Sequence, residues 1–113
     1  MPSARDDYLI RLITQAAAAL RRLRERLRDG GAPEEIAREA RGAVAELLGA
    51  QAGMLAMIDP ASASALLGDP ERVRVWAGLL RVEAEAAAQG GDRTRAAALD
   101  ARAAALERAV GGA

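Results

Sequence analysis

The chain has 113 residues, a formal net charge of zero and neither histidine nor cysteine. A neutral chain creates no overall field that would attract nucleic acid or an acidic membrane, and a chain without cysteine forms neither a disulfide nor a thiolate nucleophile. About thirty residues are alanine, and the only aromatic residues are Tyr8 and Trp76, so the core that one copy can bury is thin. Because a second copy supplies the missing burial, this composition favours a homo-oligomer, most simply a homodimer.

The first expected element is an amphipathic helix over residues 6–29, with Asp6 or Asp7 as its N-cap and Gly30 ending it. Its large aliphatic side chains recur at alternating intervals of four and three residues, which is the spacing of a heptad seam. The members of this seam are Leu9, Ile13, Ala16, Leu20, Leu23 and Leu27. Such a seam packs against another helix, in the same chain or in a second copy.

A second helix is expected over residues 33–48, because Pro33 suits a first helical turn and the apolar positions that follow recur at helical spacing. The apolar stretch 49–58 predicts a continued or kinked helix, which Gly49 and Gly53 weaken. The segment 42–58 is too short to span a membrane and contains Glu46, so a buried or interface helix is expected. Met54 and Met57 are interpreted as core residues that fill gaps.

Two repeated signals mark the next helices. Asp59 and Asp69 each precede a proline, the pattern of an N-cap followed by proline at the first helical position. They predict a short helix over 60–67, ended by Gly68, and a long helix over 70–89. The buried stripe of the long helix is expected to comprise Val73, Trp76, Ala77, Leu80, Ala84 and Ala87, with Trp76 as a core anchor rather than an interface residue.

The last helix is expected over residues 93–110, after a turn at Gly90-Gly91 and an N-cap at Asp92. No stretch alternates apolar and polar residues with the period of a strand. The prediction is therefore an all-α helical bundle of four main helices and one short linker helix, formed by a single domain over residues 1–113.

The segment from Leu80 to Leu106 resembles a tetratricopeptide hairpin. The matching features are small residues at helix-contact positions and a Gly-Asp turn: Ala84, Gly91, Asp92, Ala96 and Ala103. Bulky residues of the tetratricopeptide pattern are replaced by Ala87, Arg93 and Asp100. Over residues 6–108 the chain is similar to a family of short bacterial proteins of unknown function, which open with a helix like Asp7–Ile13. This resemblance implies an all-helical fold and supplies no activity.

Catalytic, metal and cofactor sites are not expected. The chain has no histidine, lysine or cysteine to act as base or nucleophile, and Ser62 and Ser64 have no partner that could deprotonate them. The carboxylates lack the histidines that accompany them in di-metal bundles. The glycine pairs end helices and do not follow strands as phosphate-binding loops do. The chain is therefore interpreted as a non-enzymatic protein that binds no cofactor.

The remaining candidate function is protein–protein interaction, through self-association or with another protein. The expected interface residues are Leu9, Ile13, Leu20, Leu23 and Leu27. The alternative is a regulatory or nucleic-acid-binding module that uses the basic cluster Arg21, Arg22, Arg24, Arg26 and Arg28. A bundle that binds a small molecule is a third hypothesis, and it requires a cavity. The start of the chain has no pattern of a secretory signal, so a cytoplasmic location is expected.

Overall fold

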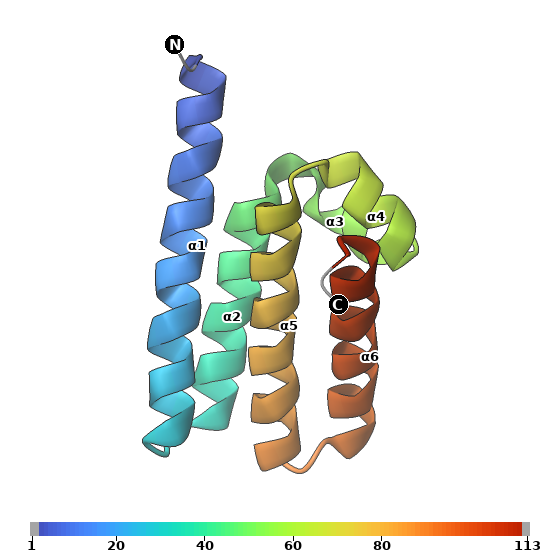
Figure 1. The fold of residues 1–113 in the computed structure, drawn as a ribbon. Helices are drawn as coiled ribbons and strands as arrows, with labels where there is room; N and C mark the ends of the chain where they lie inside the picture. Colours follow the sequence, from blue (N-terminus) through green and yellow to red (C-terminus); the bar gives the residue numbers. More distant parts are fainter. Residues whose placement is uncertain (1–2, 112–113) are drawn as a thin grey trace.

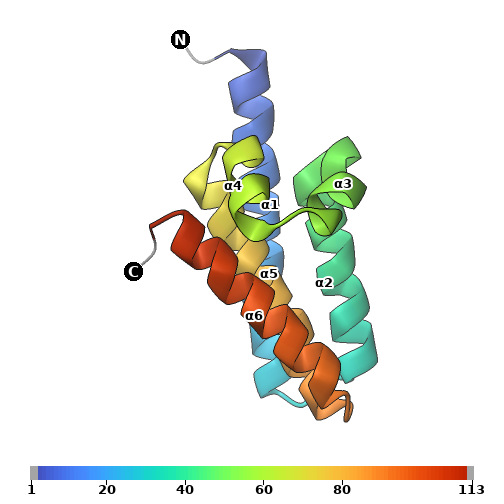
Figure 2. The ribbon, with the colours of Figure 1, turned by 90° about the vertical axis from the view of Figure 1, so that its right-hand side faces the viewer.

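The computed structural model describes residues 3–111, and every regular element in that range is helical, which confirms the all-α class. The long helices α1 (Ala4–Arg28), α2 (Pro33–Leu48), α5 (Pro70–Gln89) and α6 (Arg93–Ala109) lie side by side in that order (Figure 1). Between α2 and α5 the chain forms a 3₁₀ turn (Gly49–Gln51) and the short helices α3 (Ala52–Met57) and α4 (Pro60–Leu67). Figure 2 shows α6 crossing obliquely over α5, with α4 near the C-terminal end of α6.

Four helices were predicted to have an aspartate N-cap, and three of these predictions are confirmed. The carboxylates of Asp59, Asp69 and Asp92 accept hydrogen bonds from backbone N–H groups at the starts of α4, α5 and α6. The predicted cap of α1 is wrong, because the N-cap is Ser3 and Asp6 is the third helical residue of a capping box. Helix α1 therefore begins earlier than its apolar seam indicated.

The predicted continuation of α2 is interrupted. Gly49 has a φ of 68°, a left-handed conformation that ends the α-helix at Leu48. The chain regains α-helical geometry over Ala52–Met57, and extended backbone at Ile58 then separates α3 from α4. Because α3 is short and lies at the end of the bundle, it buries Leu55 and leaves its other side in solvent. Met54 and Met57 are 46% and 87% exposed, so their interpretation as core residues is wrong.

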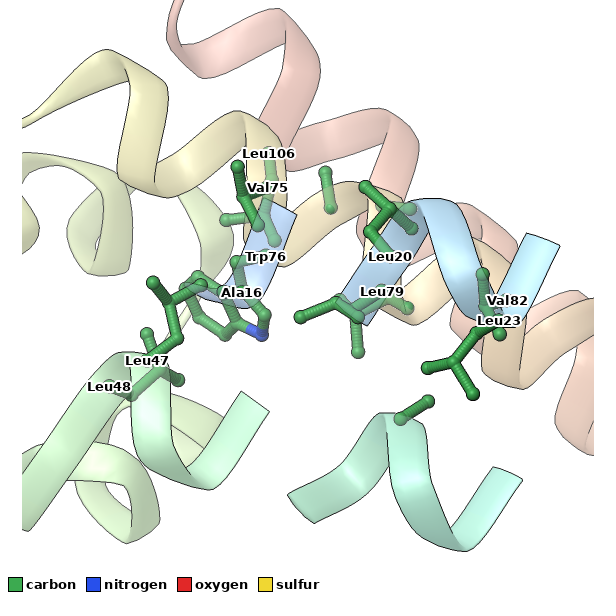
Figure 3. Packing of buried hydrophobic residues seen from close by; sticks show 14 of the residues in the cluster. Ala16, Leu20, Leu23, Leu47, Leu48, Val75, Trp76, Leu79, Val82 and Leu106 are labelled. Carbon is green, nitrogen blue, oxygen red and sulfur yellow. The ribbon is translucent and has the colours of Figure 1, made fainter. Parts of the chain in front are cut away.

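Helix α5 is the centre of the fold, since it contacts α1, α2, α4 and α6. Its residues from Val75 to Leu80 are all buried, including Trp76 at 2% exposure, which confirms that Trp76 is a core anchor. The predicted one-sided stripe was too narrow: the core also includes Val75, Leu79, Val82 and Ala86. Figure 3 shows Trp76 and Leu79 of α5 between Leu20 of α1 and Leu47 of α2.

Helices α1 and α5 approach closely at Gly78. A Cβ atom at this position would lie 2.6 Å from Cδ2 of Leu20, inside the usual contact distance. Glycine here lets a buried leucine of α1 lie directly on the α5 backbone. The close approach gives the thin, alanine-rich core contacts that longer side chains would otherwise have to supply.

Two arginine side chains satisfy the carbonyl groups left free at the ends of α2 and α3. Arg72 of α5 donates to the carbonyl of Leu47 through Nε at 2.9 Å and Nη2 at 2.6 Å. Arg102 of α6 donates to the carbonyls of Leu55 at 2.6 Å and Ile58 at 3.2 Å. Its guanidinium also lies 5.4 Å from the centre of the Trp76 ring. These contacts hold the broken segment between α2 and α4 on the rest of the bundle.

Candidate functional site

The N-terminal part of α1 extends past the ends of the other long helices (Figure 1). Its first turn is stabilised by the capping box, in which the Ser3 hydroxyl accepts from the Asp6 N–H and the Asp6 carboxylate accepts from the Ser3 N–H. We call residues 4–13 the α1 overhang. Tyr8 and Ile10 in this segment are 56% and 58% exposed, whereas the rest of α1 buries its aliphatic seam.

Apolar side chains surround more than half of the α1 overhang. At about 100° per residue, five side chains occupy an arc of about 200°. They are Tyr8, Leu9, Ile10, Leu12 and Ile13, none of which is fully buried. A surface helix that packs on one layer of neighbours needs an apolar stripe little more than 100° wide. The overhang therefore carries more apolar surface than its own chain covers.

The residues predicted to form an interface divide into two groups. Leu20, Leu23 and Leu27 lie in the core of their own chain, where α1 packs on α2 and α5; Figure 3 shows the first two. Leu9 and Ile13 lie on the α1 overhang and are only partly buried, and Ile13 also packs against the core of its own chain. The seam is thus an intrachain contact in its C-terminal half, and only its N-terminal part is accessible to a second copy.

The arginines of the predicted basic cluster also fall into two groups, one in contact with α2 and one exposed. Arg26 is half-buried and forms ion pairs with Glu39 and Glu35 of α2, so it joins the two helices. The other members, Arg21, Arg22, Arg24 and Arg28, are exposed. At positions i, i+3 and i+7, Arg21, Arg24 and Arg28 form one stripe along the helix. The structure therefore leaves part of the predicted basic surface open to solvent.

A second site lies between α2 and the α5–α6 turn, where a pocket of about 380 Å³ opens to solvent. Helix α2 lines one wall, α5 lines the floor, and the turn and the start of α6 complete it. Three arginines and three carboxylates surround the opening, and the apolar wall is made of small residues. The charged residues are Glu34, Arg38, Arg41, Glu83, Asp92 and Arg95.

Glu83 is the buried charge of this pocket, with 4% of its surface exposed. Its Oε1 atom lies 3.9 Å from Nη1 of Arg41 and 3.7 Å from Nη2 of Arg95. Both distances exceed that of a hydrogen bond. Within residues 3–111 no side-chain oxygen is both fully inaccessible and without a partner, so the Glu83 carboxylate still reaches the water of the pocket. Burial raises the pKa of Glu83, and the two nearby guanidinium groups oppose that rise.

The sequence contains a signal for Glu83 that the interpretation of the acidic residues did not use. Glu83 follows Trp76 by seven residues and Leu80 by three, so it occupies the register of the buried stripe. A carboxylate in that register is buried or lies at the edge of the core. The pocket itself depends on how α2 meets the α5–α6 turn, and no local pattern encodes that contact.

The serines have structural partners. The Ser62 hydroxyl donates to Asp59 at 2.7 Å, and this hydrogen bond is the main cause of a lowered pKa at Asp59. Ser64 is buried in α4. Residues 3–111 contain no group of three or more carboxylate, histidine or cysteine side chains placed to hold a metal ion. Within the same range, no helix combines the length and apolarity needed to cross a membrane.

Comparisons with protein-family models, with curated proteins and with solved structures find no match to this chain. The structure supports the coarse expectation of an all-helical protein. The likeness to a tetratricopeptide hairpin and to a bacterial family stays a prediction.

Proposed function

We propose that this protein is a self-association module that forms a homodimer through the α1 overhang. The observation that carries the proposal is the exposure of Tyr8 and Ile10 on a helix whose apolar arc is wider than its own chain covers. Burying apolar surface is favourable at about 25 cal/mol per Å². A second copy offers the same apolar surface, so two overhangs related by a two-fold axis would cover one another.

The α5–α6 hairpin extends the proposal to a second class of partner, another protein. Its two helices pack closely because Ala84, Ala96 and Ala103 are buried between the helices of the bundle. Close packing through small residues is the property that its tetratricopeptide-like pattern implies. We propose that α6, the outer helix of the hairpin, presents its exposed face to a partner protein, while the overhang joins two copies.

Sedimentation equilibrium tests the homodimer. The wild-type chain should give about twice the monomer mass of 11.8 kDa, and Ile10→Glu should give the monomer mass with unchanged helix content. Arg11→Glu is the matched control, because Arg11 lies in the same turn on the polar face of α1, and it should remain dimeric. A wild-type monomer at high micromolar concentration would overturn the proposal.

The alternative function, nucleic-acid binding, is favoured only by the exposed stripe Arg21, Arg24 and Arg28. Three phosphate contacts would give a weak interaction that falls steeply with salt. Mobility shifts of single- and double-stranded probes at low salt test it, with all three arginines changed to glutamine as the comparison. A shift that the triple variant abolishes supports this function, and the absence of a shift excludes it.

A further inference from the structure

The pocket around Glu83 is separate from the α1 overhang, because it lies beside the α5–α6 turn at the opposite end of the long helices. We propose that this pocket binds a small zwitterion that carries an ammonium group and a carboxylate, a compound of the amino acid class. The proposal does not depend on the proposed homodimer.

The ammonium group is expected at Glu83. A carboxylate can accept about four hydrogen bonds, and the two guanidinium groups nearest to Oε1 of Glu83 lie beyond hydrogen-bond distance of it. Among residues 3–111, the guanidinium groups of Arg41 and Arg95 are the charged groups within 4 Å of this carboxylate. Water in the open pocket can reach this carboxylate, and a ligand that brings N–H donors to the floor of the pocket replaces that water with charge-assisted hydrogen bonds.

The carboxylate group is expected at the arginines of the rim. Arg41 and Arg95 have side chains that are about half exposed. Each offers five N–H donors, and within the described part of the chain each forms one long ion pair, with Glu83. Arg38 lines the same opening from the adjacent turn of α2. Guanidinium groups bind carboxylates in a planar, bidentate geometry. The pocket therefore presents an acceptor at its floor and cationic donors at its mouth.

The balance of charge favours a zwitterion over a simple ion. Three arginines and three carboxylates line the pocket, so its formal charge is zero. A phosphate or other polyanion at the arginines would face the Glu83 carboxylate with no cation to compensate it. A simple cation at Glu83 would face Arg41 and Arg95 with no anion to compensate it. A neutral ligand with separated charges meets an opposite charge at each end.

The size of the pocket suits the same class of ligand. Its volume of about 380 Å³ lies at the small end of the range for ligand sites. The space exists because Ala37, Ala86 and Ala87 stand where longer side chains would fill it. Small compounds of a few carbon atoms between the two charged groups fit this space.

The test is a titration of the full chain, followed by amide chemical shifts, with glycine, 4-aminobutyrate and 6-aminohexanoate as probes. At least one zwitterion should cause saturable shifts in residues 34–41, 83–87 and 92–95. Butyrate and butylamine each lack one charge and should bind at least about tenfold more weakly than 4-aminobutyrate, since a hydrogen bond to a charged group contributes about 1.5–3 kcal/mol. If none of the three zwitterions causes saturable shifts at about 10 mM, the proposal is overturned.

Two variant pairs assign the contacts. Glu83→Gln should weaken the best probe at least about tenfold, while the exposed Glu85→Gln on the same helix should not change its binding. Arg95→Gln should also weaken it, against the control Arg93→Gln. If Glu83→Gln does not fold, the comparison of Arg95→Gln with Arg93→Gln still tests the proposal. Equal binding of butyrate and 4-aminobutyrate, or unchanged binding to both Glu83→Gln and Arg95→Gln, would contradict the assignment.

Discussion

Glu83 places a carboxylate on a helix whose neighbouring residues Val82, Ala84 and Ala86 are all buried. Taking a charge out of water is unfavourable unless hydrogen bonds and opposite charges replace the solvent. Arg41 and Arg95 supply part of that replacement at long distance, and the raised pKa of Glu83 shows that burial outweighs them. A valine or leucine at this position would stabilise the bundle more simply, so the residue is better explained by a function of the pocket.

Removing the Glu83 charge should change the pH dependence of folding. Because the folded pKa is raised above 4.5, the folded chain binds this proton at higher pH than the unfolded chain does. The free energy of unfolding of the wild type minus that of Glu83→Gln should therefore become more positive as the pH falls from neutral towards 4.5, and then level off. Urea unfolding followed by Trp76 fluorescence measures it. A difference that becomes more negative on acidification would show that Arg41 and Arg95 dominate.

Two glycines in helix interiors should respond oppositely to alanine. Gly78→Ala places a methyl group against Leu20 and should destabilise the fold by about 1 kcal/mol, because overpacking outweighs the gain in helix propensity. Gly42→Ala meets nothing within 4 Å and should stabilise the fold by about 0.5–1 kcal/mol. Thermal unfolding of both variants tests this contrast. Equal effects would mean that α1 and α5 do not approach closely at Gly78.

At the scale of elements, the sequence correctly predicted the helix boundaries that depend on residues close together in the chain. The Asp-Pro pairs, the Gly68 stop and the Gly90-Gly91 turn act within a few residues, and the helices that they bound lie where expected. The segment after Leu48 was less predictable, because its path depends on Arg72 and Arg102 from distant helices. The apolar composition of residues 49–58 suggested that Met54 and Met57 are core residues. They are exposed, because the short α3 packs against too few other elements to cover them.

The Arg102 contact is testable as a tertiary cap. Arg102→Met keeps the apolar stem but removes the donors to Leu55 and Ile58 and the charge over Trp76. It should lower the free energy of unfolding by about 1–3 kcal/mol and alter the Trp76 emission spectrum. Arg108→Met, an exposed position on the same helix, is the control and should change neither quantity. Similar stability of the two variants would argue against the capping role.

At the scale of the whole molecule, α1 has the most regular aliphatic seam in the sequence, yet α5 occupies the centre of the fold. The buried face of an alanine-rich helix cannot be identified from its sequence pattern, because alanine is common on both buried and exposed faces. The division of the seam follows from the unequal lengths of α1 and α2, which the predicted ranges 6–29 and 33–48 contained but which were not used to divide the seam. Helix α2 ends before it reaches the first turns of α1, so Leu9 is only partly covered.

The location of the dimer contact is the central claim, and the lack of native cysteine makes it directly measurable. A single spin label at Thr14→Cys, beside the apolar arc of α1, should give a short, defined distance between the two copies. A label at Arg93→Cys, the first residue of α6, should give a longer one, because α6 begins at the end of the bundle far from the start of α1 (Figure 1). No dipolar coupling from Thr14→Cys at high micromolar concentration, or a shorter distance from Arg93→Cys, would contradict association through the α1 overhang.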